Sequence, residues 1–258
     1  MPKGENITDQ PSGDQRVVFI DADDTLWENN RWFTRVIEEW VAFVVDLGAD
    51  GEAALFILHE EEDRNIPVHG YGARPFVHSL RTAFTRVLGE PTDATRTAFE
   101  GFVQRAELMI REHPIDLLPG VYDGVTAMAD AGLRLVLLTK GQQDEQTAKF
   151  ARSTLTHLFE SVRVVNEKDV ATYRAAAHAV GASPENCWMV GNSPRSDINP
   201  AREIGMRTVH VPHAAPWHRE LAPLVNVGPA TIVVATFADV PHAILQARPQ
   251  RDRGPLLG

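Results

Sequence analysis

The sequence is short of cysteine, of positive charge and of long apolar runs. With one cysteine, Cys187, in 258 residues, no disulfide can form within the chain, and we expect a reducing compartment. Lys and Arg number 25 against 35 Asp and Glu, a formal net charge of −10. This balance argues against a nucleic-acid backbone or an anionic membrane surface as the main partner. A small anionic substrate is still allowed if the site carries its own positive charge.

No apolar run approaches the length needed to span a bilayer, and residues 1–15 lack the apolar core of a signal peptide. We therefore expect a cytoplasmic protein with neither membrane nor nucleic acid among its partners. Its oligomeric state is unknown from sequence. The polar ends, residues 1–15 and 246–258, are rich in Pro and Gly, and we expect both to be disordered tails.

What the chain does contain is a series of short, partly β-branched apolar runs at wide spacing, typical of strands covered on both faces. These runs are residues 16–20, 133–139, 162–166, 187–191, 207–211 and 231–237. Helical periodicity ending in glycine separates several of them, at 119–132, 172–181 and 199–205. The alternation predicts an α/β fold with a doubly wound, Rossmann-like parallel sheet.

Residues 28–118 break this alternation, because they contain no convincing strand. Apolar residues recur there every three or four positions, at 33–45 and again at 99–110, which predicts amphipathic helices. We therefore expect an α/β core domain made of residues 16–27 and 119–245, with a helical domain of residues 28–118 inserted after the first strand.

Three carboxylates follow the first predicted strand within four positions. They are Asp21, Asp23 and Asp24 in the segment VVFIDADDTLW. Two unit charges about 4 Å apart repel by about 4 kcal/mol at an effective dielectric of about 20, so such a cluster needs compensation. Mg²⁺ is one solution, since it binds carboxylate oxygens while keeping waters and substrate phosphate in its shell. A solvated turn, in which Asp is common, explains the segment equally well.

Further polar residues follow later predicted strands. Thr139 ends one strand, Lys168 lies in NEKD after the next, and VGNSPRSD follows a third. In a parallel sheet these strand ends gather at the edge where ligands bind. Together with DADDT, the set resembles the four motifs of the haloacid dehalogenase superfamily: Asp-x-Asp-x-Thr, a Thr or Ser, a Lys, and Gly-Asp followed by a second Asp. The resemblance covers residues 17 to about 212.

The resemblance implies a Mg²⁺-dependent phosphatase that hydrolyses a small phosphorylated metabolite through an aspartyl phosphate. Asp21 would be the nucleophile, since a carboxylate can attack a phosphoryl group. Asp23 would be the general acid and base, because it points the same way two residues on. Thr25 resembles the family's Thr that closes the turn after the nucleophile. Dehalogenases of the superfamily lack the second Asp, so Asp23 favours phosphate ester hydrolysis or phosphoryl transfer.

The phosphoryl group needs donors and positive charge. The Thr139 hydroxyl with nearby backbone N–H groups could bind a phosphoryl oxygen. Lys168 would hold Asp21 and the phosphate together. Lys140 could take this role instead, in which case Lys168 would be an ordinary surface lysine.

The metal site implied by the resemblance would use Asp21, the backbone carbonyl of Asp23, and one or both of Asn192 and Asp197. Here the sequence departs from the family, because Gly191-Asn192 stands where the family has Gly-Asp. An asparagine offers a carbonyl oxygen to a hard cation but no charge. The sequence does not decide whether Asn192 or Asp197 contacts the metal directly.

The helical insertion lies where the superfamily carries its type 1 cap, with residues 28–31 and 114–119 as hinges. Within it, residues 64–76 form a Gly-rich, polar and aromatic stretch, and such loops often carry function. An exposed helix connection explains this stretch equally well. The candidate substrate contacts are Arg64, His69, Tyr71 and Arg74.

Residues 210–220 hold three histidines whose spacing matches no zinc pattern, and we expect a loop there with Trp217 packed against the core. Two other functions fit the same motifs. One is a phosphotransferase or mutase whose closed cap admits an acceptor hydroxyl instead of water. The other is a non-catalytic, phosphate-binding regulatory protein, which Asn192 leaves open.

Overall fold

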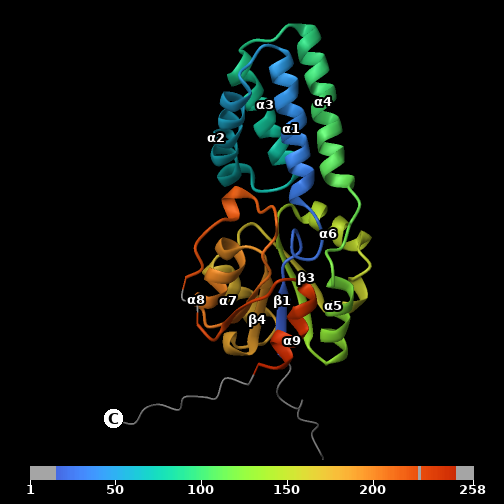
Figure 1. The fold of residues 1–258 in the computed structure, drawn as a ribbon, viewed down its shortest axis with the longest axis vertical. Helices are drawn as coiled ribbons and strands as arrows, with labels where there is room; N and C mark the ends of the chain where they lie inside the picture. Colours follow the sequence, from blue (N-terminus) through green and yellow to red (C-terminus); the bar gives the residue numbers. More distant parts are fainter. Residues whose placement is uncertain (1–15, 226–227, 248–258) are drawn as a thin grey trace, which may run out of the picture.

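A computed structural model of the protein describes residues 16–225 and 228–247, so the tail predicted at 1–15 and nearly all of that predicted at 246–258 lie outside the described residues. The described chain contains a sheet of six strands, all parallel, in the order β3-β2-β1-β4-β5-β6 (Figure 1). This arrangement confirms the predicted doubly wound α/β fold. The strands are β1 Val17–Ile20, β2 Arg134–Lys140, β3 Ser161–Val165, β4 Cys187–Gly191, β5 Arg207–His210 and β6 Thr231–Val233.

Strand β1 lies in the middle of the sheet, and its four apolar residues are fully buried. Successive side chains of a strand point to opposite faces. Val18 and Ile20 therefore pack with α5 and α9, whereas Val17 and Phe19 pack with α7 and α8. Figure 1 shows these two helical layers on either side of the sheet. The helices are α5 Val121–Asp130, α6 Gln143–Arg152, α7 Val170–Ala179, α8 Asn199–Glu203 and α9 Val240–Leu245.

The segment between β1 and α5 forms a separate bundle of helices, which lies beyond the carboxyl ends of the strands (Figure 1). It has its own apolar core, in which Trp40, Leu58 and Leu80 are fully buried. The rings of Phe84 and Phe99 stack there with centroids 3.8 Å apart. The bundle helices are α1 Asn30–Asp46, α2 Gly51–His69, α3 Ala73–Leu88 and α4 Asp93–Glu112.

The two chain segments that join the bundle to the sheet run side by side. Trp27 and Leu117 form an isolated antiparallel bridge, and the Leu118 N–H donates to the Leu26 carbonyl at 2.9 Å. These backbone bonds fix the point at which the bundle leaves the α/β layer, just past the carboxylate cluster of β1.

Two sequence-based expectations need correction. The strand expected at 231–237 ends at Val233, because Thr236 and Asp239 form a capping box that starts a helical turn at Phe237. The loop expected at 64–76 is only three residues long. Residues 64–69 continue α2 despite Pro67, and α3 begins at Ala73.

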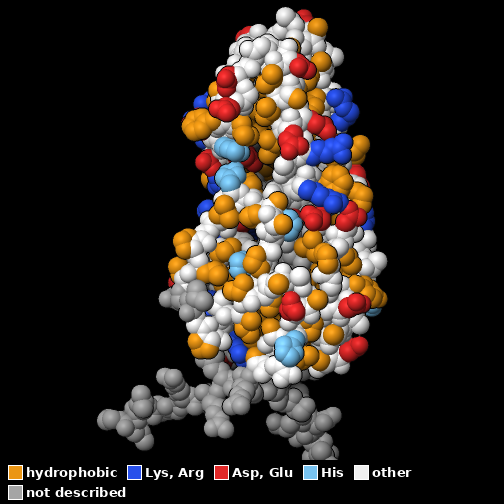
Figure 2. Space-filling model, in the orientation of Figure 1, with side chains coloured by type: hydrophobic (Ala, Val, Ile, Leu, Met, Phe, Trp, Pro, Cys, Tyr) orange, Lys and Arg blue, Asp and Glu red, His pale blue; other side chains and the backbone are white. Residues whose placement is uncertain are grey.

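The exposed face of the bundle carries charged side chains of both signs, interspersed over its helices and near its junction with the sheet layer (Figure 2). Several form ion pairs between helices, such as Arg81 with Glu100 and Arg86 with Glu60, each at 2.8 Å. Among the described residues, no helix combines the length and apolarity that a bilayer crossing requires.

Candidate active site

A cavity lies between the carboxyl ends of the strands and the helical bundle. Its floor includes Asp21 after β1, Thr139 in β2 and Asn192 after β4, while its opposite wall comes from α1, α2 and α3. The parallel sheet brings these strand ends to one edge, as expected for a ligand site in this fold.

Lys168 joins two of the predicted carboxylates. Its Nζ donates to Oδ1 of Asp21 and, at 2.8 Å, to Oδ1 of Asp197, and all three side chains are buried. Burial by itself would lower the pKa of Lys168, but the charges of Asp197 and Asp21 raise it overall, so the lysine is protonated. Burial raises the pKa of Asp21 above its usual value, and the charge of Lys168 offsets this only in part, because the neighbouring Asp197 carboxylate raises the pKa as well.

Asp23 has a different cation. Lys149 of α6 donates from Nζ to both carboxylate oxygens of Asp23 at 2.9 Å, and it also reaches the side-chain oxygen of Asn29 at 2.8 Å. Gln146 Nε2 and Trp27 Nε1 each donate to Asp23 at 2.9 Å. Burial alone would raise the pKa of Asp23, but the charge of Lys149 and these hydrogen bonds lower it. Asp23 is therefore an ionised, tightly held carboxylate.

Asp24 binds a helix end rather than a lysine. Its Oδ1 accepts from the backbone N–H groups of Asn29 and Asn30, at 2.8 and 2.9 Å, where α1 begins. Asp24 reaches this position with φ of 60°, a left-handed conformation that Asp tolerates better than most residues. The three clustered carboxylates thus take three separate partners, which offset part of their mutual repulsion.

Thr25 links the first and fourth motifs. Its hydroxyl accepts from the Asn192 backbone N–H at 3.0 Å and lies 3.1 Å from Oδ1 of Asn192. The same hydroxyl lies 3.4 Å from Oδ2 of Asp21. Asp197 approaches Gly191 so closely that a Cβ on this glycine would lie 2.2 Å from Oδ2 of Asp197. The loop after β4 is therefore fixed against the end of β1.

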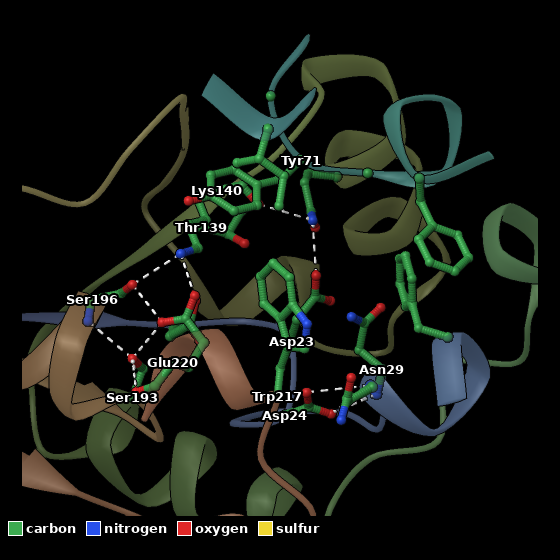
Figure 3. A pocket seen from close by; sticks show the side chains of 18 of the residues that line it. Asp23, Asp24, Asn29, Tyr71, Thr139, Lys140, Ser193, Ser196, Trp217 and Glu220 are labelled. Atoms are coloured by element: carbon green, nitrogen blue, oxygen red, sulfur yellow. Dashed lines mark hydrogen bonds and ion pairs between the residues drawn. The ribbon is translucent and has the colours of Figure 1, made fainter. Parts of the chain in front are cut away.

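Lys140 belongs to a second network on the side of the cavity formed by the loop after β4 (Figure 3). Its Nζ donates to Glu220 and, at 2.9 Å, to the Ser196 hydroxyl, and it lies 4.3 Å from the ring centroid of Tyr71. Ser193 also donates to the Glu220 carboxylate, at 2.5 Å. Glu220 thus neutralises Lys140 within the structure.

The four bundle residues expected near substrate do not act together. Only Tyr71 lines the cavity, where its hydroxyl donates to Glu167 at 2.7 Å. Arg64 is exposed on α2 and pairs with the buried Glu61 at 2.7 Å. His69 and Arg74 are exposed and lie outside the lining of the cavity. Residues 64–69 and 73–76 are helical, so each of these three side chains follows its helix face, and their contact with substrate stays a prediction.

The expectation that Trp217 packs against the core is also wrong. Trp217 is only half-buried and lines the cavity, with its ring 6.0 Å from that of Tyr71 in an edge arrangement. It is thus part of the cavity wall rather than of the apolar layers around the sheet.

The chain matches the sequence model of a known protein family. The model of the haloacid dehalogenase-like hydrolases matches residues 15–205, which is well over half of the chain. The chain belongs to this hydrolase family.

Relatives of this hydrolase include phosphatases. A phosphoserine phosphatase from Thermus thermophilus is 32% identical over 163 residues, or 60% of this chain, and the match spans 63% of the relative's length, less than two thirds. A glyceraldehyde 3-phosphate phosphatase from Methanopyrus kandleri is 23% identical over 76% of this chain and 83% of its own. A solved haloacid dehalogenase-like hydrolase from Xanthomonas campestris aligns with a TM-score of 0.75 and 28% identity, covering 92% of this chain and 93% of its own.

The oxygen donors at the floor of the cavity of this hydrolase fit a hard divalent cation. Asp21, Asn192 and Asp197 all line the cavity and are buried. Lys168 alone balances two buried carboxylates, so the site has an excess of negative charge that a cation would relieve. A separate group, Asp24, Glu28 and His213, also has ligand atoms close together, but Asp24 is already bound to the first amides of α1.

The hydrolase site also contains residues that sequence reasoning missed, namely Glu62, Gln146, Lys149 and Glu220. Gln146 and Lys149 lie on the buried face of α6 together with Glu145 and Phe150. The available signal was weak: polar residues occupy helical positions one turn apart on the side that also carries a phenylalanine. A helix of ten residues with several charges is ordinarily interpreted as solvated on its polar side.

Proposed function

We propose that this hydrolase is a Mg²⁺-dependent phosphatase that cleaves a small phosphate monoester through an aspartyl phosphate on Asp21. The observation that carries the proposal is the sharing of Lys168 by Asp21 and Asp197 at the edge of the sheet. A buried carboxylate beside a protonated lysine, open to a cavity, is suited to attack a phosphoryl group whose charge the lysine helps to balance. The phosphatases among its relatives support the same reaction class.

In the first step, the Asp21 carboxylate attacks phosphorus and the bond to the ester oxygen breaks. Asp23 donates a proton to the departing alkoxide, which leaves as an alcohol. In the second step, Asp23 takes a proton from a water that attacks the aspartyl phosphate, and this returns Asp21 and releases phosphate. Lys149 favours the ionised form of Asp23. Asp23 must therefore take up a proton from solvent, with its contact to Lys149 loosened, as the substrate binds and before the first proton transfer.

Phosphate binding falls in this proposal to Thr139 and Lys168. Thr139 is the residue before the last one of β2, and it lines the cavity with Asp21. Lys140 is the weaker candidate, because Glu220 and Ser196 already hold its ammonium.

For the metal, we assign Asp21 and Asn192 as side-chain ligands, with the Asp23 backbone carbonyl as a third. Asp197 accepts hydrogen bonds from Lys168 at 2.8 Å and from the Ser193 N–H at 3.0 Å, and its proposed role is to position Lys168. A bound Mg²⁺ would supply Lewis acidity at the phosphoryl oxygens and offset their charge.

The bundle of α1 to α4 is proposed as a cap of residues 28–118 over this site. Residues 70–72, which connect α2 to α3, contact the α/β layer. Glu145 of α6 accepts a hydrogen bond from the Ala73 N–H, at the start of α3, at 3.0 Å. Gly72, with φ of 118°, leaves room for that carboxylate, since a Cβ would lie 3.0 Å from Oε2 of Glu145. A cap in this position would exclude water and contact the leaving group.

The experiment is hydrolysis of p-nitrophenyl phosphate with and without Mg²⁺. The wild-type protein should turn over with Mg²⁺ and lose activity with EDTA. Asp21→Asn should lose at least about 1000-fold in kcat, because no nucleophile remains. Asp23→Asn should release about one equivalent of p-nitrophenolate in a burst and then stall, since this leaving group needs no proton but the aspartyl phosphate still needs a base.

The matched control is Asp130→Asn, which makes the same chemical change on the exposed end of α5. It should behave as wild type. Full activity of Asp21→Asn, or turnover that EDTA does not affect, would rule out the proposal. Far-UV circular dichroism of each variant separates loss of chemistry from loss of fold.

A further inference from the structure

The bundle side of the cavity contains a carboxylate that has no partner on one of its oxygens. Glu62 of α2 lines the cavity and is only 5% exposed. Among the described residues, none donates a hydrogen bond to its Oε2. A buried polar group without a partner is costly, so such a group in a binding cavity points to a ligand that supplies the missing donor.

The cation whose charge acts on Glu62, Arg219, does not fill this role. Arg219 acts on Glu62 only through its charge, while its own Nη1 pairs with Asp63 and its guanidinium lies 5.8 Å from the Trp217 ring centroid. Burial therefore dominates and raises the pKa of Glu62 to about 7.

The wall that carries Glu62 is mostly apolar, although Ser79 of α3 and Asn30 of α1 also line the cavity. Phe33 and Ile37 of α1, Ile66 of α2 and Phe76 of α3 line the same side of the cavity, and the rings of Phe33 and Phe76 meet edge to face at 5.1 Å. A leaving group that fits this wall has an apolar body, with one polar contact at its far end.

The cavity has no spare positive charge for a substrate carboxylate. Its described lining includes seven Asp and Glu side chains and three lysines, with no arginine or histidine. Each lysine already pairs with carboxylates: Lys140 with Glu220 and Glu167, Lys149 with Asp23, and Lys168 with Asp21 and Asp197. An anionic leaving group would thus meet net negative charge, whereas a cationic one would be attracted.

We propose that Glu62 is a specificity-determining residue that binds an ammonium group at the far end of the leaving group. The preferred substrates are then phosphate monoesters of amino alcohols with an apolar body, and phosphorylated hydroxy acids are disfavoured. This inference rests on the proposed phosphatase function. An ammonium is favoured over a hydroxyl because a charge-assisted hydrogen bond to a buried carboxylate is the stronger one.

The test is a matched series of aryl phosphates with similar leaving oxygens: 4-(aminomethyl)phenyl, 4-methylphenyl, 4-(hydroxymethyl)phenyl and 4-(carboxymethyl)phenyl phosphate. The amine should have the highest kcat/KM, about 10- to 100-fold above the methyl ester, and the carboxylate the lowest. Glu62→Gln should reduce the amine's kcat/KM to near that of the methyl ester measured on the same variant, so that the preference for the amine is lost. Glu38→Gln, on the exposed face of α1, is the matched control and should change neither value.

The same ligands are also titrated calorimetrically against Asp21→Asn and against the double variant Asp21→Asn/Glu62→Gln, so that the inference is tested even without turnover. The amine should bind more tightly than the methyl ester only when Glu62 is present. Equal values for amine and hydroxyl, or an amine preference that persists in Glu62→Gln, would overturn the inference. Failure of the proposed function has another signature, since no ester would then be hydrolysed.

Discussion

Lys149 Nζ lies 2.9 Å from each carboxylate oxygen of Asp23, although the two residues are separated by 126 positions in the chain. The lysine side chain is 1% exposed and the aspartate side chain 20%. An ion pair this buried is costly to break from one side, because the remaining charge has lost its solvent and its partner.

This relationship predicts the stability of Lys149→Met. The variant should lose about 3–5 kcal/mol of unfolding free energy, because Asp23 is left buried without its cation. The double variant Lys149→Met/Asp23→Asn should recover a large part of that loss. Urea unfolding of the wild type, both single variants and the double variant completes the cycle. Additive losses in the double variant would show that the two side chains are not energetically coupled.

Asn192→Asp should bind Mg²⁺ more tightly than the wild type, by about tenfold in Kd, because a charged oxygen replaces a neutral one next to Asp21. Without Mg²⁺ the same variant should be less stable, since it adds a carboxylate near two others. Isothermal titration calorimetry measures the affinity. Asn186→Asp, in an exposed turn before β4, adds the same charge and should leave the affinity for Mg²⁺ unchanged.

Gly191→Ala should displace Asp197, since the new Cβ would lie 2.2 Å from its Oδ2. Steric strain of this kind costs about 1–3 kcal/mol. The pairing of Asp197 with Lys168 would be disturbed as well, so kcat should fall by more than the loss of stability explains. Gly101→Ala in α4 is the control, because the nearest atom to its Cβ is the flexible Nη1 of Arg105 at 3.6 Å. Its unfolding free energy should stay the same or rise.

Glu62 should make stability depend on pH. Its pKa is about 7 in the folded protein and 4.5 as a reference for the unfolded chain, so the folded state holds this proton more tightly. Below pH 4.5 Glu62 is protonated in both states and costs nothing. As the pH rises from 4.5 to above 7, the wild type should lose up to about 3 kcal/mol of unfolding free energy relative to Glu62→Gln. Chemical unfolding of both proteins at pH 4.5, 6 and 8 measures the difference, and a constant difference would contradict the shift.

Local pattern was enough to predict the strands and the order of the motifs. The apolar runs that became β1, β2 and β4 are short, β-branched and followed by polar residues, so their ends were visible in the sequence. The apolar run at 231–237 predicts a longer strand than the one observed. At its C-terminal end, a capping box formed by Thr236 and Asp239 favours a helical turn over a strand.

Side-chain partners across elements could not be predicted in this way. Lys149 lies in a helix with several charges, and nothing in the local sequence distinguishes it from a solvated lysine. Trp217 is a large aromatic residue in a loop, a type that is usually expected to pack in the core. Their positions depend on how α6 is rotated against β1 and on how closely the loop after β5 approaches the bundle.

The sequence by itself determined the α/β fold, the family and the carboxylate cluster after β1, because each depends on residue types at short, regular spacing. Only the tertiary structure decided that Asp21, Asp23 and Asp24 take three different partners, and that Glu62 faces the cavity with an oxygen unpaired. The physical reason is that periodicity fixes which face of an element is buried, whereas contacts between faces arise only when distant elements pack together.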